Sequence, residues 1–275
     1  FLSARLPSLI IESSFGRTFP RFYIRGFGNT DFDLNASQPV SVVYDDIVQE
    51  NPIVKGFPVF DLDRVELLRG PQGTLFGRNT PAGVVKFDSR RPSQATDGYA
   101  RISYGRFGST NFEGAVGGGL SETVSMRVSA LYQSRDDYVD NTFGPGPEDE
   151  LESYDDFAAR AQLLFEGESS TALFNLHGRN LDGSARLFRA NIIRPGTNQL
   201  VSGFDRYEVA HDGINQQEVD SLGASARLSF DLGSVTLYSI TGWESADSYS
   251  RGDIDGGFGA VFAPPSGPGL IPFTA

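Results

Sequence analysis

The chain has 275 residues, of which 39% are hydrophobic and 32 are glycine, and its formal net charge is −12. This length and apolar content suffice for one large or two modest folded domains and exclude a disordered polymer. Residues 1–93 carry about 11 basic and 10 acidic side chains, so nearly all of the negative excess lies downstream. Nucleic acid is therefore not expected as a partner.

The sequence offers few groups for catalysis or for holding a metal or cofactor. Cysteine is absent, and the two histidines, His177 and His211, cannot form a histidine-rich ligand set. The segment DIDGG (253–257) has too few spaced oxygen ligands for a calcium loop. Asp45 and Asp46 are adjacent, so in a strand they would point to opposite faces, which favours a turn or strand end over a catalytic dyad. We expect no enzyme, no metal and no cofactor.

The two ends of the chain read as cuts through a longer protein. The start, FLSARLPSLI, shows no signal peptide, and the end, APPSGPGLIPFTA (263–275), reads as a loop without a closing element. No apolar run approaches the roughly 20 residues that a membrane helix needs.

Residues 1 to about 92 mix short apolar runs with glycine and proline. This pattern predicts a small mixed α/β domain with buried strands, at FYIR (22–25), VSVVY (40–44), RVELL (64–68) and VVKF (84–87), and a short helix over 59–62. Turns are predicted at GFGNTD, which begins at Gly26, and at Gly70 with Pro71. Three further glycines should allow backbone conformations or close approaches that a Cβ would obstruct, namely Gly73, Gly77 and Gly83.

From about Ala100 onward, apolar and polar residues alternate with period two. Seven strands are predicted, over 100–106, 111–120, 124–133, 157–166, 172–180, 222–232 and 235–245. In the third strand, Leu131 is the one exception to the alternation. Short links at 120–122, 167–170 and 232–234 alternate with wider ones, the longest over 135–156 and 182–220.

This antiparallel meander, with short turns at one end and long loops at the other, favours an outer-membrane β-barrel in contact with lipid. A soluble β-sandwich can also show such alternation. Barrels in bacterial outer membranes have even strand numbers and no free edge, so seven strands are too few and more are expected after Ala275.

Three blocks in order, IRGFG (24–28), VSVVYDDI (40–47) and LDRVELLRGPQGTLFGRNTPAGVVKFDSRRP (62–92), resemble the TonB-dependent outer-membrane transporters. The resemblance implies an α+β plug domain over 1–93, followed by an antiparallel transmembrane β-barrel over 94–275 that shows about 7 of 22 strands. The ending VVKFDSRRP departs from the commoner form of this motif in the family.

The resemblance also implies a location and a function. The protein is expected in the outer membrane of a Gram-negative bacterium, where it would take up a small molecule, most often an iron–siderophore complex. The TonB–ExbB–ExbD energy-coupling complex would act through a segment upstream of Phe1. Receptors of the same family for cobalamin, nickel chelates or oligosaccharides stay open, as do a passive channel and an adhesion barrel. A soluble carbohydrate-active enzyme would need clustered carboxylates and aromatics, which we do not find.

Two arginines, Arg25 and Arg69, match positions at which the family's plugs pair with barrel-wall glutamates. The resemblance therefore implies that they help to lock the plug, against the alternative of an ordinary ion pair or a solvated side chain. The ligand-contacting residues are unknown; the loops 26–38 and 52–58 are candidates that could instead pack against the wall. The loop 135–156 carries about nine acids and one arginine, which indicates either a solvated loop or a segment for ligand capture.

Overall fold

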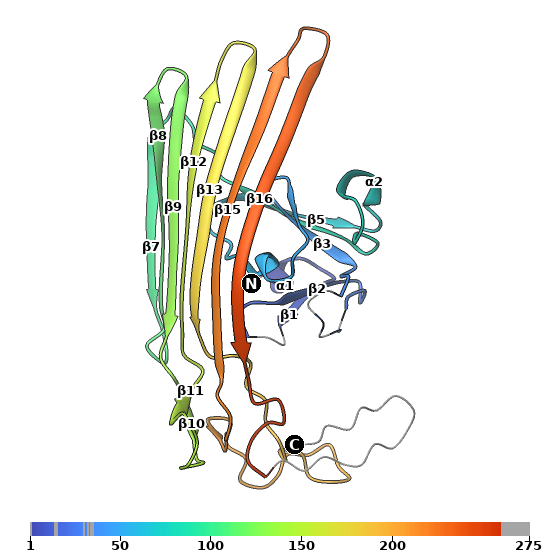
Figure 1. The fold of residues 1–275 in the computed structure, drawn as a ribbon, viewed down its shortest axis with the longest axis vertical. Helices are drawn as coiled ribbons and strands as arrows, with labels where there is room; N and C mark the ends of the chain where they lie inside the picture. The colour runs from blue at the N-terminus through green and yellow to red at the C-terminus, as the bar shows by residue number, and fades with distance from the viewer. Residues whose placement is uncertain (1, 14–15, 30, 32, 34–35, 260–275) are drawn as a thin grey trace.

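The computed structural model describes residues 2–13, 16–29, 31, 33 and 36–259. These residues form a small N-terminal unit, called the plug below after the resemblance, and a long curved sheet that stands beside it (Figure 1). The predicted terminal loop 263–275 lies outside the described residues, as do several positions of the loop 26–38.

The plug contains two small sheets and very short helices. Its elements in chain order are α1 (Leu2–Arg5), β1 (Leu9–Ser13), β2 (Pro20–Ile24), β3 (Val40–Tyr44), β4 (Ile47–Gln49), η1 (Val54–Gly56), β5 (Leu62–Arg69), α2 (Gly73–Phe76) and β6 (Gly83–Ser89). Strands β1 and β2 form one antiparallel pair, and a second sheet has the order β4-β3-β6-β5, in which β3 and β6 run parallel. All four predicted strands are therefore confirmed. Within the described ranges, no helix is long and apolar enough to cross a membrane.

The helix predicted over 59–62 is absent, and β5 already begins at Leu62. The nearest helical turn is η1, which ends before Phe57, whose ψ of 130° is extended. Because Pro58 follows, helical backbone at Phe57 is sterically disfavoured. Asp61 then adopts a left-handed backbone with φ of 49°, which a helix does not permit.

The plug has an apolar core between its two sheets. Its buried members come from four strands and one turn: Leu9, Phe22, Ile24, Val40, Val42, Tyr44, Ala82, Val85 and Phe87. Hydrophobic side chains inside and polar ones outside are the usual arrangement for a unit that folds against water.

Four of the five predicted turn glycines adopt a positive φ, namely Gly26, Gly70, Gly77 and Gly83. Gly73 instead begins the one-turn helix α2, so the predicted turn contains a helical segment. At Gly83 a Cβ would lie 2.2 Å from the carbonyl oxygen of Leu68, because β6 starts in close contact with β5. This position therefore needs glycine for both conformation and space.

The long curved sheet beside the plug, called the wall sheet below, contains every strand predicted after Ala100. Its strands are β7 (Asp97–Tyr104), β8 (Thr110–Ser121), β9 (Val124–Arg135), β12 (Tyr154–Glu166), β13 (Ser170–Gly183), β15 (Gln216–Asp231) and β16 (Thr236–Arg251). They are antiparallel neighbours in the order β16-β15-β13-β12-β9-β8-β7. The plug ends with β6 at Ser89 and the wall begins with β7 at Asp97; the division at 93/94 stays a proposal.

Short turns join the wall strands at one end and long loops at the other, as predicted (Figure 1). The long loops carry β10 (Val139–Asn141), β11 (Glu150–Leu151) and β14 (Glu208–Val209), which form a small sheet of order β11-β10-β14. Val139, Leu151 and Val209 pack together within it. The loop 135–156, called the acidic loop below, and the loop before β15 are therefore folded against each other.

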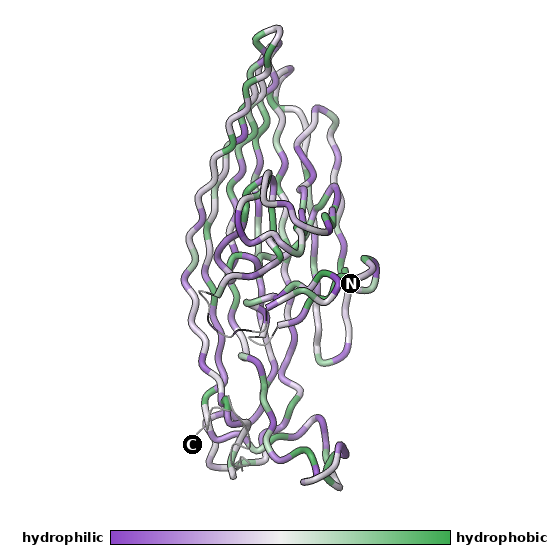
Figure 2. The backbone as a smooth tube through the Cα atoms, turned by 90° about the vertical axis from the view of Figure 1, so that its right-hand side faces the viewer, coloured by the Kyte–Doolittle hydropathy of each residue, from purple (hydrophilic) through white to green (hydrophobic). Residues whose placement is uncertain are grey.

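The two faces of the wall sheet differ in polarity, and along its strands hydrophobic and hydrophilic residues alternate (Figure 2). The face toward the plug buries Ser125, Arg127, Ser129, Asp156, Arg160, Gln162, Asn175 and Arg179. The opposite face exposes Ile102, Val116, Val128, Phe157, Phe165, Phe174, Leu176, Leu222 and Trp243. Leu131, the exception in the sequence pattern, faces inward and packs with Phe60 and Ala158. An apolar outer face and a polar inner one are typical of outer-membrane barrels.

Candidate functional site: the interface between plug and wall

The wall sheet holds the plug through three buried arginines on adjacent strands. Arg127 lies on β9, Arg160 on β12 and Arg179 on β13. In the strand register, Arg127 is opposite Gln162, and Arg179 is opposite Ala158. The three guanidinium groups therefore step diagonally across the same face, two residues apart along β12, and none is more than 5% exposed.

The first arginine forms a bidentate ion pair across the interface. Nε and Nη2 of Arg127 donate to the two carboxylate oxygens of Asp61 at 2.7 and 2.6 Å, and Nη1 donates to Asp97 at 2.9 Å. The side chains of Arg127 and Asp61 are each only 1% exposed. A fork-to-carboxylate geometry of this kind is strong and directional, and removal of one partner would leave a buried charge.

The second arginine binds mainly the plug backbone. Nη2 of Arg160 donates to the carbonyl oxygens of Phe60 (2.9 Å) and Asp61 (3.2 Å), and Nη1 donates to the hydroxyl of Tyr44 (2.9 Å). The guanidinium carbon also lies 4.8 Å from the centre of the Phe60 ring. Burial raises the pKa of Tyr44, so its hydroxyl stays neutral beside the arginine.

The third arginine is anchored within the wall and reaches the plug from there. Arg179 forms two hydrogen bonds to Asp156, at 2.9 and 2.8 Å, and its Nη1 donates to the carbonyl oxygen of Gly56 at 2.9 Å. From the plug, Arg17 contacts the same carboxylate at 3.4 Å and donates to Gln133 at 2.7 Å. Asp156 thus connects a wall cation with a plug cation.

A hairpin turn forms a further polar contact. Asp45 and Asp46 join β3 to β4, and both have a positive φ (48° and 68°), as a two-residue turn of type I′ requires. Asp45 accepts a hydrogen bond from Asn175 at 3.1 Å, and Asp46 forms an ion pair with Arg227. The predicted turn role of the aspartate pair is confirmed, and the turn touches two wall strands.

The two arginines predicted to lock the plug lie away from these contacts. Both side chains are exposed, and Arg69 donates to the carbonyl oxygen of Pro7 at 3.1 Å within the plug. Arg25 has a left-handed backbone with φ of 52°, and its backbone N–H donates to Ser8. In the described part of the chain, no ion pair joins either arginine to a wall glutamate, so their pairing stays a prediction.

Of the two predicted ligand loops, 52–58 packs against the wall. Its Gly56 binds Arg179, and the ring of Phe57 lies edge-on to His177 at 5.0 Å. Lys55 is buried, and burial lowers its pKa to about 8. At the start of loop 26–38, two backbone hydrogen bonds between Ile24 and Phe27 close a tight turn. Ligand contacts therefore stay unassigned.

Sequence reasoning missed the wall arginines as site residues. The signal was present in part, because Arg127 and Arg160 fall on the polar side of the predicted strands. Their partners Asp61 and Phe60 lie 66 and 100 residues away in the chain. No local pattern links residues so far apart.

Comparisons with known proteins agree with this geometry. Residues 2–84 match the family model of the TonB-dependent receptor plug domain. The chain is 33% identical over 94 residues to the pesticin receptor of Yersinia pestis, covering 34% of this chain and 14% of that receptor. It is 28% identical over 129 residues to the ferrioxamine B receptor of Salmonella typhimurium, covering 46% of this chain and 17% of that receptor.

Solved structures show the same fold over most of the chain. The ferric yersiniabactin uptake receptor from Yersinia pestis superimposes with a TM-score of 0.76 at 19% identity, covering 91% of this chain and 39% of that one. The ferripyoverdine receptor of Pseudomonas aeruginosa gives a TM-score of 0.60 at 18% identity, covering 82% and 28%. These chains are receptors rather than enzymes. The chain thus has the fold of a plug followed by the first strands of a receptor β-barrel, and its residues 2–84 match the plug domain of TonB-dependent receptors.

Proposed function

We propose that this protein takes part in the TonB-dependent active transport of an iron–siderophore complex across the outer membrane. The observation that carries the proposal is a plug seated by buried, charge-assisted hydrogen bonds on the polar face of a wall whose other face is apolar. The substrate class is supported by the relatives, whose names refer to ferrioxamine, ferric yersiniabactin and ferripyoverdine.

The interface suits a plug that must be held firmly and yet be moved. It consists mostly of hydrogen bonds and ion pairs, which water can replace one at a time, together with a small apolar cluster at Leu131. A polar cavity of about 650 Å³ lies between the plug and the wall, lined by residues that include Asp46, Lys86 and Arg227. Water in such a cavity would lower the free energy required to separate charged partners.

The energy would enter from the N-terminal side of the plug, through the TonB–ExbB–ExbD complex. Arg17 and Thr18 contact the wall through Asp156 and Gln217. Because they precede the four-stranded sheet in the chain, a pull from that side would load their bonds before those of Asp61. The plug would then detach in steps rather than as one block.

An uptake assay tests the proposal. A strain without the gene for this protein should lose the uptake of at least one radiolabelled ferric siderophore under iron limitation, and the gene supplied in trans should restore it. The same loss is expected in a strain without TonB. Uptake that continues without TonB would indicate a passive channel instead. Normal uptake of every iron chelate, with loss of cobalamin, a nickel chelate or an oligosaccharide, would contradict the substrate class.

An engineered disulfide tests whether the plug moves. The 275 residues contain no cysteine, so the pair Asp45→Cys and Asn175→Cys, placed to join the β3–β4 turn to β13, has no competing thiol within this chain. We expect oxidation to stop uptake and a dithiol reductant to restore it, whereas Asp45→Cys alone should transport under both conditions. Full uptake by the oxidised double variant would show that transport does not require this turn to separate from β13.

A further inference from the structure

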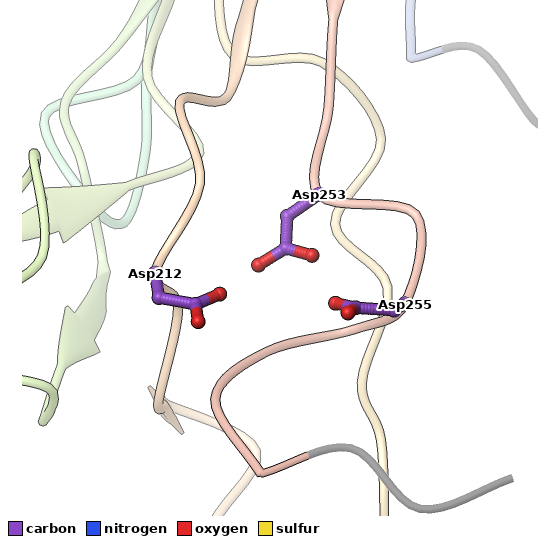
Figure 3. A group of neighbouring side chains, drawn as sticks. All are labelled: Asp212, Asp253 and Asp255. Atoms are coloured by element: carbon purple, nitrogen blue, oxygen red, sulfur yellow. The ribbon is translucent and has the colours of Figure 1, made fainter. Parts of the chain in front are cut away.

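Three aspartates from two loops converge beyond the loop-side ends of β15 and β16. Asp212 precedes β15, whereas Asp253 and Asp255 follow β16. One carboxylate oxygen from each lies within 4.8 Å of the others, and Figure 3 shows the three side chains pointing toward a common space. The segment DIDGG alone has too few ligands for calcium, but Asp212, 41 residues earlier than Asp253, adds a third carboxylate.

A second observation comes from the buried side of this cluster. His211 is completely buried, and neither ring nitrogen has a hydrogen-bond partner among the described residues. Its Nε2 lies 3.7 Å from Oδ2 of Asp253, a buried oxygen that likewise has no hydrogen bond within the described ranges. Buried polar atoms of this kind require a partner, because their desolvation is otherwise uncompensated.

We propose that Asp212, Asp253 and Asp255 bind a calcium ion, with His211 positioning the carboxylate of Asp253. Calcium takes oxygen ligands at about 2.3–2.6 Å, so two ligands of one ion lie at most about 5 Å apart. The 4.8 Å limit of the cluster fits this size. Mutual repulsion among three carboxylates, one of them buried, is relieved by a dication.

The ion would hold together the loops on that side of the wall. The backbone N–H and carbonyl of His211 bond to Asn141 in the acidic loop. On the other side, the N–H of Phe258 donates to Ala210, and the N–H of Ala190 donates to Gly256. Segments from three loops therefore meet within a few residues of the aspartates, and bound calcium would stabilise their arrangement. This inference does not depend on the transported substrate.

Calcium titration of the purified protein in detergent micelles tests the site. We expect calorimetry to show one site with an affinity in the range of about 0.1–1 mM, typical of extracellular calcium modules. Asp212→Asn and Asp253→Asn should each weaken binding at least tenfold. Glu150→Gln, which removes one exposed charge from the acidic loop, is the matched control and should bind as the parent does.

Hydrogen exchange supplies a second readout. Calcium should slow amide exchange in residues 210–213 and 252–258 of the parent protein, and should leave exchange there unchanged in Asp212→Asn. No calcium binding by the parent up to about 10 mM, ten times the weak end of that range, would overturn the proposal. An equal loss of affinity in Glu150→Gln would do so too, because it would show diffuse attraction to acidic loops.

Discussion

The plug and the wall sheet are both built mainly from β-strands, yet they bury opposite kinds of side chain. The plug encloses Val40, Val42 and Val85, and most of its charged side chains are at least partly exposed, although Arg21, Lys55 and Asp61 are buried. The wall buries arginine, serine and aspartate against the plug and exposes phenylalanine, leucine and tryptophan on its other face. The difference shows that the plug is adapted to a polar environment on all sides, whereas the wall has one polar and one apolar face, as outer-membrane barrels do.

The largest effect is expected where the polar contact is deepest. Asp61→Ala removes the partner of a buried guanidinium, and we expect a loss of about 3–5 kcal/mol in the stability of the docked plug. Denaturant unfolding in detergent, followed by hydrogen exchange in β3 and β6, would measure it. Arg78→Gln, which removes an exposed ion pair with Glu50, is the control and should cost less than about 1 kcal/mol. Similar losses in both variants would show that burial of the Asp61 pair contributes nothing.

The apolar face of the wall can be tested with a single charge. Leu176 lies midway along β13 and is 53% exposed on the face opposite the plug. If that face contacts lipid, Leu176→Arg should cost about 2–4 kcal/mol, measured by reversible unfolding from lipid vesicles. Glu168→Arg, in the short turn before β13, should cost about 0–1 kcal/mol because it lies near the membrane surface. A negligible cost at Leu176 would mean that this face contacts water.

A smaller, pH-dependent effect is expected from the one lysine buried at the plug surface. The pKa of Lys55 is about 8 in the folded protein and 10.5 ordinarily. Between these values the unfolded chain binds more protons, so plug stability should rise as the pH rises from about 8 to 10.5.

Lys55→Met should abolish this rise in an unfolding series across that pH range. Lys86→Met should retain it, because Lys86 already forms ion pairs with Asp46 and Asp88. A pH dependence that is unchanged in Lys55→Met would refute the assignment.

The smallest effect concerns the β3–β4 turn. Both Asp46→Ala and Asp46→Gly remove the ion pair with Arg227, but only glycine accommodates the φ of 68° without strain. Asp46→Ala should therefore be less stable than Asp46→Gly by about 1 kcal/mol. Thermal unfolding of the two variants would measure the difference, and equal stability would show that the turn relaxes.

Period-two alternation was sufficient to predict every strand of the wall sheet. Successive residues of a strand point to opposite faces, so a sheet with one polar and one apolar face requires polar and apolar residues to alternate. Leu131 departed from the pattern for a reason outside its strand, the contact with Phe60. The prediction of a helix over 59–62 was wrong because Asp61 has a left-handed backbone conformation, which a helix does not permit. Asp61 adopts it at the contact with Arg127 and Arg160 on the wall. Contacts between the two units are long-range, so local sequence could indicate which residues face inward but not which ones pair.

The arginines of the wall differ in which groups of the plug they bind. Arg160 and Arg179 grip the main-chain carbonyls of Phe60, Asp61 and Gly56, which persist whatever side chain occupies those positions. Arg127 instead binds a plug side chain, the carboxylate of Asp61. Arg160 also donates to the hydroxyl of Tyr44, and Arg227 pairs with the carboxylate of Asp46. During evolution the rest of the plug surface could therefore diverge while docking is preserved, and correlated substitution between the two units should concentrate at the pairs 61 and 127, 44 and 160, and 46 and 227.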